Sequence, residues 1–345
     1  MIRPTPRPFP LFLDLVRQTA EKDPQLARRA LSGVRIYGDA VRLSRPMRTT
    51  VARLGRVSLL DGGGTSGPPV VLVPSLINPS SVLDLAPGNS LTEHLSESGF
   101  RPFLLDWGCP TPADRHEGIA DHVTDYLVPL VAQLSTQFNE PVHLVGYCLG
   151  GTMALAAAAQ GRARALTLLA TPWHFDRYGE DARIAMRDHW ARHRSAVDAM
   201  GMMPIEVLQS LFWALAPERT VSKYAALADA APDDAQAMAF ATLEDWANSG
   251  APITASAARE LFDDLIGTNA SGTGNWQVGG QAITPKSLSI PCMHFTAHED
   301  RIAPAATAPD GIARTPCPSG HVGMVVGRGA RAGCWEPLTR WLHKN

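Results

Sequence analysis

The segment Val142–Ala159, VHLVGYCLGGTMALAAAA, places a cysteine at a sharp turn between a buried strand and a helix. The apolar run Val142–Val145 predicts the strand, and the Ala-rich run Thr152–Ala159 predicts a tightly packed helix. A nucleophile held in strained backbone at a helix N-terminus needs neighbours without a Cβ, and glycines flank Cys148 on both sides. The competing interpretation is a Gly-rich turn around a buried, inert cysteine.

This pattern resembles the nucleophile elbow of α/β hydrolases, in which an acid and then a histidine follow the nucleophile along the chain. Asp300 lies in a loop after the predicted strand Ile290–Ala297, and His321 lies in a Gly-flanked turn further on. We therefore assign Cys148 as the nucleophile, His321 as the general base and acid, and Asp300 as the carboxylate that orients the imidazole.

Three neighbouring residues compete for the acid and base roles. Glu299 precedes Asp300 directly, and a sequence pattern cannot separate two adjacent residues at a loop tip. Among the 11 histidines, His294 falls inside the predicted strand and His298 precedes the acid. His321 is preferred because it follows the acid loop in a Ser-Gly-His turn.

An oxyanion hole needs two backbone N–H donors near the nucleophile. Leu149, at the start of the predicted helix, supplies the first. The second is expected in the loop after the buried strand Pro69–Pro74. Pro74 has no N–H, so the donor is Ser75, Leu76 or Ile77, and we favour Leu76 or Ile77.

Strand and helix signals alternate along the chain, with further strands expected at residues 103–108 and 165–170. This alternation predicts an α/β fold with a mostly parallel sheet, helices on both faces and chemistry at the carboxyl ends of the strands. Residues 180–247 instead show helical periodicities rich in Ala and Met, without strand signals. We predict an N-terminal helical arm (1–55), an α/β-hydrolase core (56–174 and 288–345) and an inserted helical cap (175–287).

Two segments outside the core carry more specific expectations. The N-terminal helix pattern fits a docking arm or a helix packed on the core, and we favour the packed helix. In the cap, Phe212, Trp213 and Trp246 are first choices for an apolar lid that keeps water from Cys148. Ordinary helix packing is the alternative for each of them.

Composition limits the other possibilities. The net charge of −2 gives no reason to expect nucleic acid, and the five scattered cysteines without C-x-x-C argue against a disulfide framework and against zinc. No cofactor or metal is expected. The N-terminus lacks the apolar core of a signal peptide and no uninterrupted apolar stretch approaches membrane-spanning length, so we expect no transmembrane segment and a cytoplasmic protein.

Beyond the elbow, the chain resembles polyhydroxyalkanoate synthases, cysteine-dependent polyester polymerases, and among them the short two-component type. By position, this resemblance assigns the family's catalytic Cys, Asp and His to Cys148, Asp300 and His321. The chain departs from the family in two places. Pro74-Ser75 stands where the family usually has Pro-Pro, and the predicted cap has little obvious likeness to the cap of well-known synthases. The matching pieces are Val73–Asn78, Val82–Leu85, Asn89–Leu91, Leu104–Trp107, Gly146–Gly151, Glu299–Pro304, and Ser319–Val322 with Val325-Val326.

The resemblance implies an acyltransferase that polymerises (R)-3-hydroxyacyl-CoA into polyester with release of CoA through a Cys thioester. The implied partners are the acyl-CoA, the growing polyester, and a second copy or a second synthase subunit, in the cytoplasm or at a polyester granule surface. A hydrolase, either an intracellular polyester depolymerase or an acyl thioesterase, is the alternative, because water can replace the alcohol at the same triad. A catalytically silent granule-associated or scaffold protein is disfavoured by the complete triad.

Overall fold

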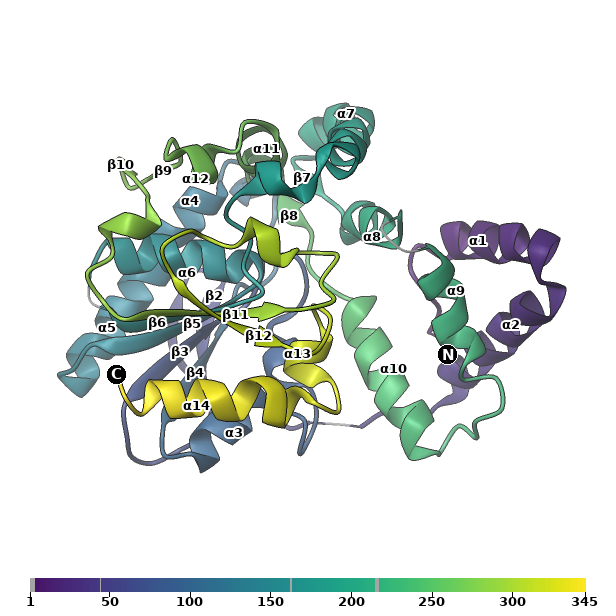
Figure 1. The fold of residues 1–345 in the computed structure, drawn as a ribbon, viewed down its shortest axis with the longest axis horizontal. Helices are drawn as coiled ribbons and strands as arrows, with labels where there is room; N and C mark the ends of the chain where they lie inside the picture. Colours follow the sequence, from purple (N-terminus) through teal and green to yellow (C-terminus); the bar gives the residue numbers. More distant parts are fainter. Residues whose placement is uncertain (1–3, 44, 162, 215–216) are drawn as a thin grey trace. The chain divides into compact units, whose positions relative to one another are not determined.

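The computed structural model describes residues 4–43, 45–161, 163–214 and 217–345 (Figure 1). Residues 1–3, 44, 162 and 215–216, which belong to the predicted arm, core and cap, lie outside the described residues. The chain divides into two compact units. The α/β unit is built from residues 47–84, 88–203 and 251–345, and the helical unit from residues 1–46, 85–87 and 204–250.

An eight-stranded sheet forms the centre of the described α/β unit, in the order β1-β2-β4-β3-β5-β6-β11-β12. All neighbours from β4 to β12 in this order are parallel, whereas β2 is antiparallel to both β1 and β4. The predicted α/β class with a mostly parallel sheet is confirmed. The strands are β1 (Thr50–Leu54), β2 (Val57–Asp61), β3 (Pro69–Val73), β4 (Arg101–Asp106), β5 (Val142–Tyr147), β6 (Ala163–Leu169), β11 (Cys292–Ala297) and β12 (Ala313–Cys317).

Helices cover both faces of this sheet, with α6 on one side and α3 and α14 on the other (Figure 1). Helix α6 is almost completely buried, which explains its Ala-rich sequence, because small side chains let it approach β5 and β6 closely. The helices of this unit are α3 (Leu91–Glu97), α4 (Ile119–Asp121), α5 (Val128–Phe138), α6 (Leu149–Ala159), α7 (Glu180–Met200), α11 (Ala255–Arg259), α12 (Ala270–Thr273), α13 (Gly323–Val326) and α14 (Glu336–Leu342).

Two short antiparallel pairs lie within the segment predicted as a cap. Strands β7 (Met202–Met203) and β8 (Ile253–Thr254) pair with each other, although no strand was expected at β7. Strands β9 (Gln277–Val278) and β10 (Gln281–Ala282) form a tight hairpin through Gly279-Gly280. Both central glycines have positive φ, as a two-residue hairpin turn requires.

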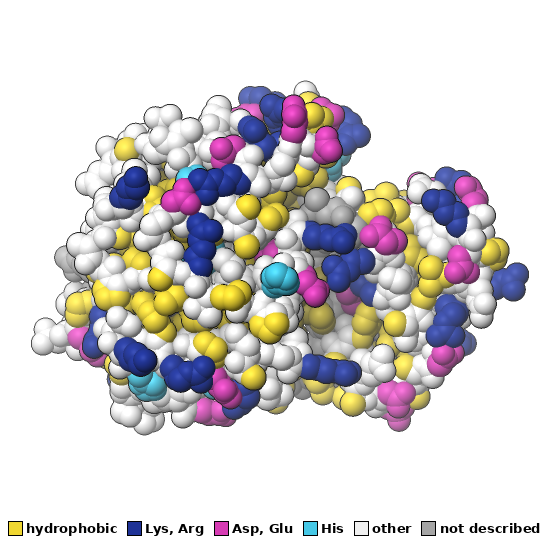
Figure 2. Space-filling model, viewed as in Figure 1, with side chains coloured by type: hydrophobic (Ala, Val, Ile, Leu, Met, Phe, Trp, Pro, Cys, Tyr) yellow, Lys and Arg dark blue, Asp and Glu magenta, His cyan; other side chains and the backbone are white. Residues whose placement is uncertain are grey.

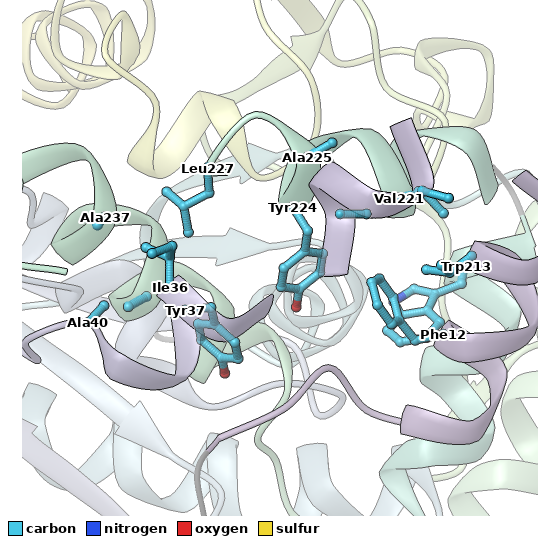
Figure 3. Close-up of a cluster of buried hydrophobic side chains, with 14 residues drawn as sticks. Phe12, Ile36, Tyr37, Ala40, Trp213, Val221, Tyr224, Ala225, Leu227 and Ala237 are labelled. Atoms are coloured by element: carbon cyan, nitrogen blue, oxygen red, sulfur yellow. The ribbon is translucent and has the colours of Figure 1, made fainter. Parts of the chain in front are cut away.

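The helical unit has its own hydrophobic core (Figure 3). Phe12 and Tyr37 pack edge-on against Tyr224 at centroid distances of 5.0 and 5.8 Å, and Phe12 contacts Trp213 at 6.3 Å. The buried Tyr224 hydroxyl donates to Glu244 at 2.7 Å. The helices of this unit are α1 (Phe9–Lys22), α2 (Pro24–Asp39), α8 (Ile205–Ala214), α9 (Pro217–Ala225) and α10 (Ala235–Ala247).

The compact units do not follow the predicted domain boundaries. Strand β1 begins at Thr50, inside the predicted arm of residues 1–55, and belongs to the sheet. The predicted cap of residues 175–287 is divided between the units, since residues 204–250 belong to the helical one. The reason is that α1 and α2 bury their apolar sides against α9 and α10 within the helical unit.

The same packing involves residues that were first choices for the lid. Trp213 belongs to the core of the helical unit, where it contacts Phe12, as the alternative of ordinary helix packing expects. Phe212 and Trp246 also belong to the helical unit, and Trp246 is buried. Trp190, by contrast, lies in the α/β unit and stacks on Phe262.

The molecular surface shows charges of both signs interspersed over the face in Figure 2. This agrees with the formal net charge of −2. Among the described helices, none combines the length and apolar character needed to cross a membrane.

Candidate active site

Cys148 occupies the turn between β5 and α6, with φ 56° and ψ −132°. Non-glycine residues rarely adopt a positive φ, and such strain is typical of a nucleophile elbow. The backbone is held on both sides: the Cys148 N–H donates to the Leu169 carbonyl at 2.9 Å, and the Gly151 N–H donates to the Cys148 carbonyl at 2.9 Å. The side chain is half-buried at the N-terminus of α6.

The glycines after Cys148 are required by close contacts. A Cβ on Gly150 would lie 2.3 Å from the carbonyl oxygens of Val73 and Pro74, at the end of β3. A Cβ on Gly151 would lie 1.9 Å from Thr171 Oγ1. Both distances are far below van der Waals contact, so this turn needs residues without side chains, as the sequence predicted.

His321 and Asp300 meet at the carboxyl ends of the neighbouring strands β11 and β12. The imidazole Nδ1 lies 2.7 Å from Asp300 Oδ2, and both side chains are buried. The other carboxylate oxygen, Oδ1, accepts the N–H groups of Ile302 and Ala303, each at 2.8 Å. Asp300 is thus oriented by the backbone on one side and holds the imidazole on the other.

The electrostatics of His321 depend on two partners. Burial by itself would lower the pKa of His321, but the charges of Cys148 and Asp300, and the hydrogen bonds that each makes to the imidazole, raise this pKa to about 10. Since Nδ1 faces Asp300, the other ring nitrogen is left for the sulfur. The structure therefore brings together the three residues assigned from the sequence.

The competing residues have other surroundings. Glu299 and His298 are exposed. His294 is buried in β11, where Nε2 accepts the Thr171 N–H at 3.0 Å, and burial lowers the pKa of His294 to about 3. None of the three replaces Asp300 or His321 in the contact described above.

The expected oxyanion donors differ in whether their backbone N–H already makes a hydrogen bond within the protein. Leu149 is the first residue of α6, directly after Cys148. The Ile77 N–H donates to Ser75 Oγ at 3.2 Å and so has an internal partner. The loop is fixed by Trp107, whose Nε1–H donates to the Pro74 carbonyl at 3.0 Å. Leu76 is thus the better candidate for the second donor.

A small cavity of about 20 Å³ adjoins this loop, with space for about one water molecule. Leu76, Trp107 and Ile253 contribute apolar wall. On its polar side, Arg56 contacts His122 Nε2 at 2.8 Å and pairs with Glu117 at 2.5 Å.

Comparisons with known proteins agree with this fold. A family model described as alpha/beta hydrolase fold matches residues 68–194. The chain is 27% identical over 288 residues to a poly(3-hydroxyalkanoate) polymerase subunit PhaC from Haloferax mediterranei, covering 79% of this chain and 58% of the relative. It is 26% identical over 291 residues to PhaC from Allochromatium vinosum, and the match covers 80% of this chain and 81% of that relative.

The chain is a distant homologue of PhaC with the α/β-hydrolase fold. It spans 58% and 60% of the length of the PhaC relatives from Haloferax mediterranei and Haloarcula marismortui. Among solved structures, Rv0554 from Mycobacterium tuberculosis matches with a TM-score of 0.50 at 15% identity, covering 84% of this chain and 92% of that one, which supports the fold alone.

Motif residues of this PhaC homologue that lie outside the triad hold loops together. Asp84 pairs with Arg48 at 2.5 Å and accepts the Ser90 hydroxyl at 2.5 Å. Asn89 donates to the Val326 carbonyl at 3.0 Å, just after the His321 turn. The resemblance noted in the sequence therefore includes structural residues as well as candidate catalytic ones.

Two tyrosines next to the site were not predicted. The Tyr147 hydroxyl donates to the His321 carbonyl at 3.3 Å, and its ring lies 5.1 Å from the imidazole. The Tyr178 hydroxyl donates to the Ile302 carbonyl at 2.8 Å in the acid loop. Tyr147 could have been noticed because it directly precedes Cys148, whereas no local sequence signal marks Tyr178.

Proposed function

We propose that this PhaC homologue is an acyltransferase that polymerises (R)-3-hydroxyacyl-CoA through a thioester on Cys148. The observation that carries the proposal is the arrangement of Cys148 on a strained elbow, beside an imidazole that contacts Asp300 at 2.7 Å. The similarity to PhaC supports the choice of substrate.

The first step is acyl transfer from CoA to Cys148. A protonated imidazole beside a sulfur favours the nucleophilic thiolate form of cysteine. The sulfur attacks the acyl carbonyl carbon, the bond from that carbon to the CoA sulfur breaks, and His321 gives its proton to the leaving CoA sulfur. One thioester replaces another at nearly equal free energy, so the acyl group stays activated.

The second step depends on the loss of the negative charge of Cys148 when the sulfur is acylated. The charge of Cys148 is the largest of the effects that raise the pKa of His321. Once the sulfur carries an acyl group, that effect is lost and the pKa of His321 falls, so the imidazole, which has given its proton to CoA, can act as a base. It takes the proton of a second hydroxyacyl unit, whose oxygen attacks the thioester, forming an ester and releasing Cys148.

Both steps pass through an oxyanion, for which we propose the N–H groups of Leu149 and Leu76 as donors. Leu149 stands at the N-terminus of α6, where the helix dipole adds to the stabilisation of negative charge. Ile77 is the weaker choice because its N–H already donates to Ser75.

The test is to incubate the pure protein with 3-hydroxybutyryl-CoA and to measure CoA, polymer and free acid. We expect CoA release with polymer, and mass spectrometry of the quenched protein should find the acyl group on Cys148. Cys148→Ala should abolish CoA release, and Cys148→Ser should lose most of it because a serine hydroxyl needs stronger base assistance. Free acid without polymer would instead establish a depolymerase-like or thioesterase-like hydrolase.

The proposal extends to partners and location. The similar proteins are named polymerase subunits, and we propose that this chain acts as a homodimer or with a second synthase subunit. Its proposed place is the cytoplasm or a granule surface, where the growing polyester is held. Sedimentation of the active fraction, with and without polymer, tests both statements.

A further inference from the structure

Tyr178 contacts the acid loop through a partly buried hydrogen bond. It closes the short helical turn Phe175–Tyr178, and its half-buried ring stacks on Phe175 at 5.9 Å. Its hydroxyl donates to the Ile302 carbonyl at 2.8 Å. The phenol also lies close enough to Cys148 and Asp300 for their charges to act on it.

One peptide group joins Tyr178 to Asp300. The Ile302 carbonyl and the Ala303 N–H belong to the same peptide unit, and the Ala303 N–H donates to Asp300 Oδ1 at 2.8 Å. A donor at the carbonyl end of a peptide polarises its N–H and strengthens the bond that the N–H makes. The series of hydrogen bonds runs from the Tyr178 hydroxyl through this peptide to Asp300, and from there to His321.

The segment that carries Tyr178 is anchored on the far part of the same loop. The N–H groups of Trp173 and His174 both donate to the Thr307 carbonyl, at 2.7 and 2.8 Å. Arg177 makes a two-pronged contact with Asp310 at 2.9 and 2.6 Å. These contacts fix the backbone just before the turn and the Arg177 side chain within it, so the phenol reaches the 302–303 peptide from a defined position.

We propose that Tyr178 is a positioning residue, whose hydroxyl holds the 302–303 peptide so that Asp300 stays oriented toward His321. The proposal rests on the Cys148, His321 and Asp300 roles given under the proposed function. Without the hydroxyl, the peptide can rotate, and the carboxylate it fixes then supports the protonated imidazole less well.

Among the described residues, few titratable groups surround His321. Cys148 and Asp300 are the charged groups that act on His321. Burial raises the pKa of both Tyr147 and Tyr178 well above the ordinary value, so these phenols remain protonated. A change in the pH profile of Cys148 reactivity therefore reports on His321 and Asp300.

The experiment measures alkylation of Cys148 by iodoacetamide as a function of pH, using peptide mass spectrometry because the chain has five free cysteines. In Tyr178→Phe we expect the midpoint to move to higher pH, with a rate at pH 7 about two- to tenfold lower, the effect of one lost hydrogen bond. The phenyl ring keeps the stacking on Phe175, so the fold is retained, which a melting curve checks.

Tyr37→Phe is the matched control, because Tyr37 is a buried tyrosine whose hydroxyl donates to Asp245 at 2.7 Å in the helical unit. Its profile should match the wild type. The proposal is overturned if Tyr178→Phe shows no shift, a downward shift, or the same shift as Tyr37→Phe.

Asp300→Asn separates this proposal from the proposed function. It should move the midpoint in the same direction as Tyr178→Phe and further. If Asp300→Asn leaves the profile unchanged, the triad itself is refuted, and the role of Tyr178 falls with it. If the midpoint shifts in Asp300→Asn but not in Tyr178→Phe, only the positioning role of Tyr178 is refuted.

Discussion

Oδ2 of Asp300 lies 2.7 Å from Nδ1 of His321, while Oδ1 of the same carboxylate accepts two backbone N–H groups. The carboxylate therefore cannot rotate without losing bonds on both sides. A fixed carboxylate keeps the imidazole in one orientation, and it stabilises the positive charge on the ring.

This relationship predicts that Asp300→Asn affects the two chemical steps unequally. Acylation should be impaired less than alcohol attack, because a thiolate can attack unaided whereas a hydroxyl of high pKa needs a base. His321→Gln should slow both steps by about 10²- to 10⁴-fold. Rapid-quench kinetics with 3-hydroxybutyryl-CoA measure the two rates, and equal impairment of both in Asp300→Asn would contradict the split.

The raised pKa of His321 predicts a pH dependence of stability. In the folded protein this pKa is about 10, whereas an unfolded histidine titrates near 6.5. A raised pKa contributes stability that is complete below about pH 6.5 and is lost as the pH rises through about 10. Melting temperatures between pH 6 and 10 should fall more steeply for the wild type than for His321→Gln. Parallel curves would show that the imidazole has an ordinary pKa.

Gly151→Ala should destabilise the α/β unit. The new Cβ would lie 1.9 Å from Thr171 Oγ1, next to the elbow, so the backbone must shift. Overpacking of this kind costs about 1–3 kcal/mol. Thermal unfolding measures the loss, and Gly329→Ala is the control because a Cβ there meets nothing within 4 Å. Wild-type stability and activity in Gly151→Ala would refute the close contact.

Trp213→Ala should destabilise the helical unit without changing the ratio of free acid to polymer. The indole is buried in a core with Phe12, and removal of a buried aromatic side chain costs about 3–5 kcal/mol. Leu13→Ala, at a side chain with 43% exposure on the same helix as Phe12, is the control. If Trp213→Ala instead raises the free acid at unchanged stability, the lid prediction from the sequence gains support.

The sequence by itself was sufficient for features that depend on neighbouring residues. The elbow around Cys148 could be predicted because strand periodicity, close-packed glycines and an Ala-rich helix follow one another within one short segment. The buried strands β3, β4, β5, β6 and β11 were predicted for the same reason, since each is a local apolar run. Strand β12 was missed because its residues are mostly exposed and include Pro316, so it carries no such signal.

Only the tertiary structure decided between residues that are alike in sequence. Asp300 and Glu299 are adjacent carboxylates, and the direction in which each points depends on strands that pair across more than a hundred residues of chain. The contact between Tyr178 and the acid loop, and the division of the predicted cap between two units, are likewise set by long-range packing. The sequence of an amphipathic helix predicts which side is buried, but it does not predict which element that side packs against. In helix α1, Phe12 packs against Trp213 of α8 and Tyr224 of α9.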